Sequence, residues 1–184
     1  MILPIIPYGH AVLRKKGRTV PAITPEIRQL VADMIETMRA AHGVGLAAQQ
    51  IGQDLQLCVI EITPEVSKER PSRKWVDGKE TDPHEHMPLV LVNPVIEMTK
   101  KKETGPEGCL SFPGLTADIV RGYRVKVTHQ DLEGKTHTFE AAGLLGRAVQ
   151  HEYDHLQGVL FIDRMDPADR AELKDEIEAL RRND

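Results

Sequence analysis

The stretch His151-Glu152-Tyr153-Asp154-His155 decides how the rest of the chain is interpreted. On a helix, His151 and His155 lie one turn apart on the same face, and Glu152 places a carboxylate beside the first imidazole. Two neutral imidazoles at this spacing can share a divalent cation, which lowers the pKa of a bound water so that Glu152 can accept and pass on the proton. The pattern predicts a metal-dependent hydrolase, and the competing interpretation is the polar face of a solvated helix.

Length and composition favour a soluble protein with one domain. With 184 residues and 40% hydrophobic content, the chain can bury a substantial core without disulfides, so we expect a single domain spanning 1–184. The formal charge of −4 and the scattered basic residues argue against nucleic acid as a direct substrate. Two cysteines and the lack of an N-terminal export signal predict a cytoplasmic location. Apolar runs such as 89–92 are too short to cross a bilayer, so no membrane partner is expected.

The N-terminal half contains signals for one helix and two buried strands. Thr24 is expected to cap a helix whose apolar residues recur at helical spacing until Gly43. Branched aliphatic residues predict buried strands at 55–62 and 89–92. Cys58, in the first strand, is interpreted as a small core residue without a chemical role.

The C-terminal half adds a hairpin and two helices. Alternating valines and a turn sequence predict a hairpin within 119–139. The motif helix is expected from about 143 to 157, with Gly158 as its helix-ending glycine, and a last helix from about 168 to 182. These elements predict an α+β fold in which mostly antiparallel sheets pack around a central motif-bearing helix, with an N-terminal and a C-terminal helix.

The segment at about 63–88 interrupts this pattern. It is polar, is rich in proline, carries the single tryptophan Trp75, and shows neither a strand nor a helix period. We therefore expect a long surface excursion here.

A catalytic metal of this kind needs a third protein ligand and an open position for water. A histidine six residues beyond His155 would complete a longer known motif, but Phe161 occupies that place. Glu176 and Glu178 are better explained as part of a solvated helix face. Cys109 remains, because a thiolate and two imidazoles suit Zn²⁺ or Fe²⁺. Considered alone, a single cysteine is usually a buried apolar residue.

Three segments occur in a fixed order along the chain. They are Gly43-Val44-Gly45-Leu46-Ala47-Ala48-Gln49-Gln50, Glu107-Gly108-Cys109-Leu110-Ser111 and Gln150-His151-Glu152-Tyr153-Asp154-His155-Leu156-Gln157-Gly158. Together they resemble the defining motifs of the peptide deformylase family, and the likeness extends over nearly the whole chain. The resemblance implies an enzyme that removes the N-formyl group from the N-terminal methionine of newly synthesised proteins and releases formate.

The resemblance also implies a role for each polar residue of the motifs. Cys109, His151 and His155 would hold one divalent ion, Fe²⁺ in the most active form, with Zn²⁺, Ni²⁺ or Co²⁺ able to take its place. Glu152 would be the acid/base. The Gln50 side-chain amide and the backbone N–H of Leu110 would stabilise the developing oxyanion, a task that suits preorganised donors.

Substrate contacts are expected along two segments. The resemblance places Gly43, Val44 and Gly45 beside the substrate, where the absence of side chains on the glycines lets an extended peptide pair with the backbone. Leu144 and Ala148 share a helix face with His151 and are predicted to line an apolar pocket for the methionine side chain. The competing interpretation is that both are ordinary core contacts.

Three charged residues near the motifs receive structural interpretations. Arg147, one turn before His151, is expected to be a solvated arginine, and the competing interpretation is that it guides an acidic substrate tail. Glu107 and Arg121 resemble a paired acid and base in the family, so we expect them to support the site rather than to react.

The predicted partners are N-formylmethionyl nascent peptides, with transient ribosome association implied by the resemblance. The segment 163–184 is acidic, which argues against docking on the ribosome through a basic tail. Two competing functions remain at this point. One is a zinc endopeptidase with the same His-Glu-His core, and the other is a non-catalytic metal-binding or nascent-chain-binding protein.

Overall fold

The computed structural model describes residues 1–182, and residues 183–184, at the end of the expected domain, lie outside the described residues. Within 1–182 the helices are α1 (Pro25–Ala40), α2 (Pro64–Glu69), α3 (Gly143–Leu156), α4 (Pro167–Glu172) and α5 (Lys174–Arg182). The strands are β1 (Gly45–Ala47), β2 (Leu57–Ile60), β3 (Ser72–Val76), β4 (Lys79–Thr81), β5 (Leu89–Met98), β6 (Lys102–Cys109), β7 (Phe112–Gly122), β8 (Arg124–Gln130) and β9 (Thr136–Ala142).

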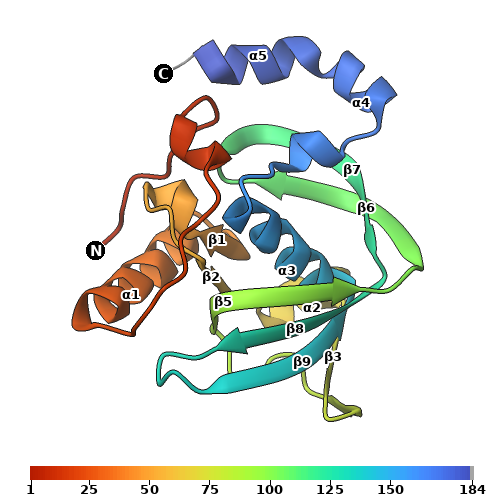
Figure 1. The fold of residues 1–184 in the computed structure, drawn as a ribbon. Helices are drawn as coiled ribbons and strands as arrows, with labels where there is room; N and C mark the ends of the chain where they lie inside the picture. The colour runs from red at the N-terminus through yellow and green to blue at the C-terminus, as the bar shows by residue number, and fades with distance from the viewer. Residues whose placement is uncertain (183–184) are drawn as a thin grey trace.

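Helix α3 lies at the centre of the molecule, between two antiparallel sheets (Figure 1). The larger sheet has seven strands in the order β1-β2-β5-β8-β9-β3-β4, and every neighbouring pair is antiparallel. The smaller sheet is the β6–β7 hairpin. The α+β fold with mostly antiparallel sheets around the motif-bearing helix is therefore confirmed, together with the N-terminal and C-terminal helices.

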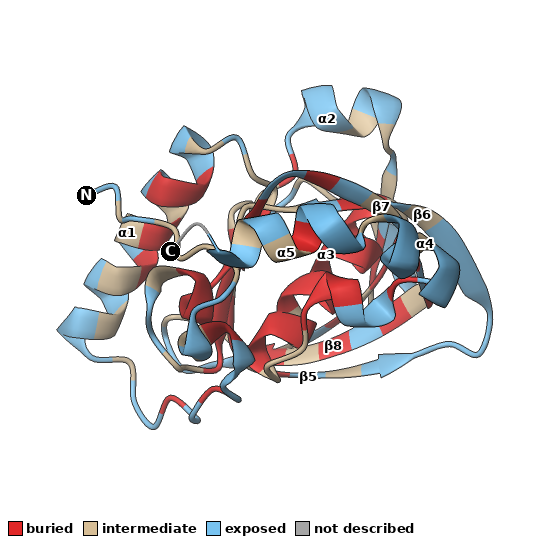
Figure 2. Ribbon diagram, turned by 90° about the horizontal axis from the view of Figure 1, so that it is seen from above, coloured by how far each residue is buried: buried red, intermediate tan, exposed pale blue. Residues whose placement is uncertain are grey.

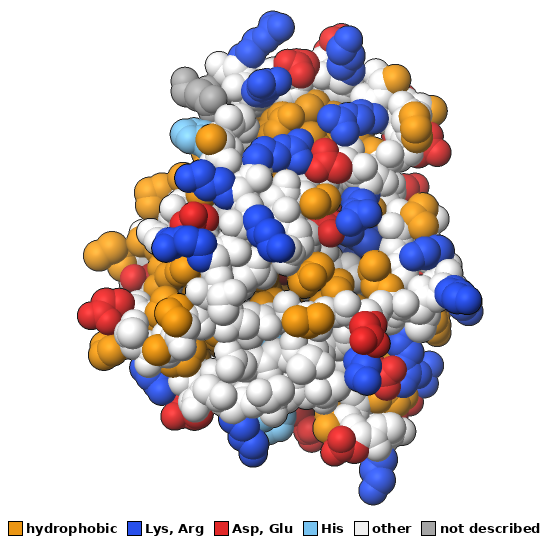
Figure 3. All heavy atoms as spheres, in the orientation of Figure 1, with side chains coloured by type: hydrophobic (Ala, Val, Ile, Leu, Met, Phe, Trp, Pro, Cys, Tyr) orange, Lys and Arg blue, Asp and Glu red, His pale blue; other side chains and the backbone are white. Residues whose placement is uncertain are grey.

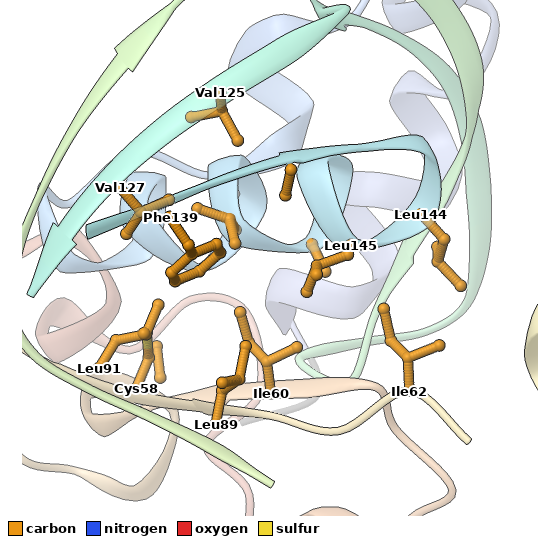
Figure 4. Packing of buried hydrophobic residues seen from close by; sticks show 14 of the residues in the cluster. Cys58, Ile60, Ile62, Leu89, Leu91, Val125, Val127, Phe139, Leu144 and Leu145 are labelled. Carbon is orange, nitrogen blue, oxygen red and sulfur yellow. The ribbon is translucent and has the colours of Figure 1, made fainter. Parts of the chain in front are cut away.

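The main apolar cluster fills the space between the seven-stranded sheet and α3. Figure 4 shows Phe139 from β9 and Leu91 from β5 on opposite sides of the cluster, which also contains Leu145 of α3. Cys58 lies in the same cluster with none of its surface exposed, as predicted, and burial raises the pKa of its thiol well above the usual value. Figure 2 shows that α3 is buried on nearly all sides, more than any other helix. Its polar side chains therefore need hydrogen-bond partners within the protein.

Helix α1 and the β8–β9 hairpin follow their sequence signals. The hydroxyl of Thr24 accepts a hydrogen bond from the backbone N–H of Ile27 at 3.2 Å, so Thr24 is the N-cap of α1 as predicted. Between β8 and β9, Asp131 accepts hydrogen bonds from the backbone N–H groups of Glu133 and Lys135, which fixes the turn of the predicted hairpin.

The segment 63–88, whose sequence shows neither a strand nor a helix period, contains regular structure. It contains α2, β3 and β4, and β3 joins the seven-stranded sheet beside β9. Trp75 is only 8% exposed, and two guanidinium groups pack over its ring, that of Arg73 at 4.7 Å and that of Arg124 at 3.6 Å from the ring centroid. The local sequence shows no strand period because β3 pairs with a strand far along the chain and its tryptophan is buried under arginine side chains.

The expected last helix is divided into α4 and α5 at Leu173. The break lets Leu173 and Ile177 both pack against the apolar cluster that contains Phe112 and Phe161. The segment packs against the core, but the prediction of one continuous helix was wrong, because contact with the core outweighs helix continuation at Leu173.

Charged side chains of both signs are interspersed on the face of the molecule drawn in Figure 3. No helix within residues 1–182 combines the length and the apolar character needed to span a membrane.

The end of α3 depends on a glycine in the left-handed region. Gly158 has φ 75°, and the next residue, Val159, donates its backbone N–H to the carbonyl of Asp154 at 2.9 Å, which closes the helix as predicted. A Cβ on Gly158 would lie 2.5 Å from the carbonyl oxygen of Arg14, a backbone atom of the N-terminal segment. The residue is therefore fixed by both conformation and space.

We predict that Gly158→Ala lowers the free energy of unfolding by roughly 2–4 kcal/mol, the sum of left-handed strain and an overpacked contact. Gly134→Ala is the matched control, because Gly134 has φ 78° and nothing within 4 Å of the added Cβ. It should cost only the strain of about 1 kcal/mol. Equal losses in chemical denaturation of the two variants would contradict the contact with Arg14.

Candidate metal centre

The three predicted ligands meet at one point. His151 and His155 lie one turn apart on α3, and Cys109 is the last residue of β6, at the tip of the β6–β7 hairpin. One ligand atom from each residue lies within 4.8 Å of the other two, and the Cys109 sulfur is 3.3 Å from Nε2 of His155. Tetrahedral bonds of about 2.3 Å to sulfur and about 2.1 Å to nitrogen would separate such atoms by roughly 3.6 Å. The donor set therefore fits a transition-metal ion.

Glu107 orients the first imidazole. Its carboxylate lies 2.8 Å from Nδ1 of His151, which leaves Nε2 of that ring available as a ligand atom. Burial alone would raise the pKa of Glu107, but the hydrogen bonds from Arg121 and His151 outweigh it and hold this pKa far below its usual value. Glu107 is thus a permanent carboxylate within the hydrogen-bonded wall of the site.

A buried ion network joins the hairpin to α3. Arg121 of β7 binds Glu107 with two hydrogen bonds of 2.8 Å and Asp154 of α3 with one of 2.6 Å. Arg147 is also buried and donates to Glu107 at 2.9 Å and to the backbone carbonyl of Ile119 at 2.8 Å. The expected pairing of Glu107 with Arg121 is confirmed, whereas the expectation of a solvated Arg147 was wrong, because the folded hairpin covers it.

Glu152 is the carboxylate without a partner. It is 4% exposed, and its Oε2 atom has no hydrogen bond from any residue within 1–182. Burial raises the pKa of Glu152 to about 7, with the positive charge of His151 opposing this rise. A carboxyl group that titrates near neutrality can both take up and release a proton, as acid/base chemistry requires.

Gln50 reaches the same centre from the short helix at Ala48–Ile51. Its Oε1 atom accepts the backbone N–H of Ala47 at 3.0 Å, which fixes the amide so that Nε2 points toward the hairpin tip. There Nε2 lies 3.2 Å from Oγ of Ser111 and 3.5 Å from the Cys109 sulfur. Ser111 was quoted in the sequence motif without a role, and the structure makes it the partner that orients this donor.

A cavity of about 460 Å³ opens onto the centre. Among its lining residues are ten that the sequence predicted, namely Gly43, Val44, Gly45, Gln50, Cys109, Leu110, Leu144, Ala148, His151 and Glu152. His155 is 1% exposed and lies outside this lining. Arg70, at the end of α2, also lines the cavity and was missed, because nothing in the local sequence of the excursion connects it to the hairpin.

A Cys/His/His set that could hold a cation, beside a cavity and a carboxylate without a hydrogen bond on one oxygen, is typical of the metal-dependent hydrolases. The family model for polypeptide deformylase matches residues 2–171 of the chain. The chain belongs to the peptide deformylase family. It is a metal-dependent hydrolase that removes the N-formyl group from the N-terminal methionine of newly synthesised proteins.

Individual relatives cover almost the full length. The peptide deformylase of Methylacidiphilum infernorum is 46% identical over 184 residues, which is 100% of this chain and 95% of the relative. The crystal structure of peptide deformylase from Ehrlichia chaffeensis superposes with a TM-score of 0.83 at 32% identity, covering 97% of this chain and 96% of that one. A peptide deformylase from Synechococcus elongatus, solved in complex with actinonin, gives a TM-score of 0.79 at 37% identity, covering 97% and 85%.

Gly45 leaves room for the carboxylate of Glu152. A Cβ on Gly45 would lie 2.5 Å from Oε1 of Glu152 and 2.9 Å from its Cδ and Cγ atoms. We predict that Gly45→Ala displaces this carboxylate and lowers kcat about a hundredfold, the scale of an ångström-size misplacement, while the bound metal per chain stays unchanged. Steady-state kinetics with metal analysis of the same preparation test this.

Gly108→Ala provides the matched control for Gly45→Ala, since Gly108 lines the same cavity. A Cβ there would meet its nearest atoms at 3.6 Å, an ordinary contact. This variant should keep most of its rate. A Gly45→Ala enzyme as fast as the Gly108→Ala enzyme would show that Glu152 does not need the cleared space.

Proposed function

We propose that Cys109, His151 and His155 hold one divalent ion, Fe²⁺ in the cell, and that the formyl group is hydrolysed there. The observation that carries the proposal is the meeting of a sulfur and two imidazole nitrogens, within 4.8 Å of one another, around the base of the cavity. A soft thiolate with two imidazoles suits Fe²⁺, and Zn²⁺, Ni²⁺ or Co²⁺ can occupy the same set.

When bound, such an ion lowers the pKa of water and polarises a carbonyl oxygen. Glu152 provides the proton transfers. Its unpaired Oε2 takes a proton from the attacking water, and the same carboxyl group then gives a proton to the departing amine. Burial, which raises the pKa of Glu152 to about 7, makes both transfers favourable near neutral pH.

Gln50 and Leu110 stabilise the negative charge that develops on the formyl oxygen. The Gln50 amide is held by Ala47 and Ser111 before any substrate arrives, so it donates without reorganisation. Leu110 occupies the turn between β6 and β7, next to Cys109, and offers its backbone N–H. Removal of one donor of this kind typically costs a hundredfold or more in rate.

The substrate lies along 43–45 with its methionine directed toward α3. The backbone of Gly43, Val44 and Gly45 lines the cavity and can pair with an extended peptide. Leu144 and Ala148 line the same cavity one turn apart on α3 and form the apolar pocket for the methionine side chain. N-formylmethionyl nascent chains are thus the substrates.

The proposal extends to the setting of the reaction. The chain works as a single catalytic domain, 1–184, in the cytoplasm, where formylated nascent chains are made. Ribosome association is transient and does not depend on a basic tail, since α4 and α5 carry acidic side chains in their first turns.

Formate release separates this function from the alternatives. The Fe²⁺-loaded enzyme, kept anaerobic, should release formate from formyl-Met-Ala-Ser and leave the peptide bonds intact. Internal cleavage of an unformylated peptide would identify an endopeptidase instead. Metal binding without either activity would indicate a non-catalytic binding protein.

Two substitutions separate metal binding from proton transfer. Cys109→Ala should lose the metal, because two imidazoles alone hold it weakly, and activity should disappear with it. Glu152→Gln should keep one metal per chain but lose turnover by a thousandfold or more, since it removes the proton acceptor. Metal analysis and formate release check both, and a Cys109→Ala enzyme with full metal and rate would overturn the ligand assignment.

Ala148→Leu tests the methionine pocket. The larger side chain fills space that the substrate needs, so kcat/KM for formyl-Met-Ala-Ser should fall about ten- to hundredfold. Formyl-Ala-Ala-Ser, with its short first side chain, should lose much less. Equal losses for both peptides would place the methionine side chain elsewhere.

A further inference from the structure

A second cavity, of about 490 Å³, lies against β3, β8, β9 and the start of β5. It shares no lining residue with the cavity at the metal centre. Four residues of the 63–88 segment line it, including Lys74 of β3. Its volume lies within the range of small-molecule sites, so the character of its walls decides what it could hold.

Lys74 is a buried cation without a counterion. The residue is 5% exposed, and its ammonium group lies over the ring of Phe139, 5.2 Å from the centroid. Burial lowers the pKa of Lys74, and the more distant charges of Asp82 and Glu85 only partly offset this. Neither carboxylate forms an ion pair with it among the described residues. Buried lysines are nearly always paired, so a partner is missing here.

The two acidic residues that line this cavity already have hydrogen-bond or ion-pair partners. Asp131 lies 2.6 Å from Nε2 of His137 and also accepts two backbone N–H groups of the hairpin turn. Glu133 forms an ion pair with Arg28 at 3.3 Å. Of the three residues Asp131, Glu133 and Lys74 in the cavity wall, only Lys74 has no side-chain hydrogen-bond or ion-pair partner among residues 1–182.

Apolar side chains form a continuous part of the wall, beside polar residues that include His129 and Thr138. Val76, Leu89, Leu132 and Phe139 contribute hydrocarbon surface to the lining. His129 donates Nδ1–H to the carbonyl of Gln130 at 3.1 Å, so its Nε2 atom has no partner within residues 1–182. The wall thus offers one ammonium donor beside a ring-sized apolar surface.

We infer that this cavity is a second ligand site, which binds a small organic carboxylate with an apolar body. The carboxylate pairs with the Lys74 ammonium, and the apolar part lies against Phe139 and Leu89. The site shares no lining residue with the cavity at the metal centre. Ligand binding at this site therefore does not depend on the proposed deformylation at the metal centre.

Titration of the Zn²⁺-loaded enzyme with phenylacetate tests the inference, with the neutral isostere phenylacetamide as the ligand control. Phenylacetate should bind in the millimolar range or tighter, and phenylacetamide at least tenfold more weakly, because only the acid pairs with Lys74. In amide spectra of the labelled enzyme, shifts should centre on Leu89, His129 and Phe139. Shifts confined to 43–45 and 107–110 would mean binding at the metal centre and would overturn the proposal.

Lys74→Met should weaken phenylacetate binding ten- to hundredfold, because it removes the charged donor but keeps the length of the side chain. Lys126→Met is the matched control, since Lys126 is exposed and lies on the outer face of β8, between the inward-facing Val125 and Val127. It should leave binding unchanged. Both variants should keep the wild-type rate of formate release, which also shows that they fold.

If Lys74→Met were unfolded, Lys74→Gln would serve in its place, and the comparison of acid with amide on the wild-type enzyme does not depend on either variant. Unchanged affinity for phenylacetate in a folded Lys74 variant would overturn the assignment. So would the absence of binding by the wild-type enzyme at millimolar phenylacetate.

Discussion

The carboxylate of Glu107 holds the two halves of the metal centre together. It lies on β6, two residues before Cys109, and it binds Arg121 of β7 and both Arg147 and His151 of α3. The candidate ligands come from elements that are distant in sequence, Cys109 from β6 and the two histidines from α3. The distances between the ligand atoms therefore depend on how the β6–β7 hairpin packs against α3. Loss of one partner from a buried ion pair costs roughly 3–5 kcal/mol, which is a large share of the stability of a domain. The position of Cys109 relative to the imidazoles is therefore fixed by the same contacts that fix the fold.

Enclosure of α3 by two sheets shapes the chemistry as well as the geometry. A helix buried on nearly all sides brings Glu152 into a medium of low dielectric constant, where the neutral carboxyl group is favoured. The backbone of Gly45 passes so close to this carboxylate that a side chain would not fit. Close packing and the shifted pKa have one origin, because each follows from the exclusion of water around the helix.

Much of the fold and of the site could be predicted from the sequence, and the failures have a common physical cause. The helical spacing of His151 and His155, the Thr24 cap and the Gly158 terminator act within one or two turns of chain, so local sequence reveals them. The candidate third ligand, Cys109, was found by eliminating the other candidates and then through the resemblance, because no spacing rule links it to a helix some forty residues away. Trp75 is buried through arginines contributed by two different strands.

Arg147 and Lys74 show the same limit for charged residues. Each is charged and was expected on a surface, but a hairpin covers Arg147, and β3 turns Lys74 toward the apolar side of the sheet. The pairing of distant strands decides which face of a strand is buried. The charge of a residue does not predict which face it will lie on. The ion partners of Arg147 and the cavity beside Lys74 could be found only once the strands were paired.

The two cysteines differ in exposure, so thiol reactivity can report how much of the metal site is occupied. Cys58 is sealed in the core with its thiol held protonated, whereas Cys109 is partly exposed and opens onto the cavity. A thiol-reactive dye added to native enzyme would therefore find a single sulfur per molecule, and a cation bound there would shield it. The amount of dye taken up thus counts the empty centres in a preparation, and full denaturation adds the second sulfur as an internal standard.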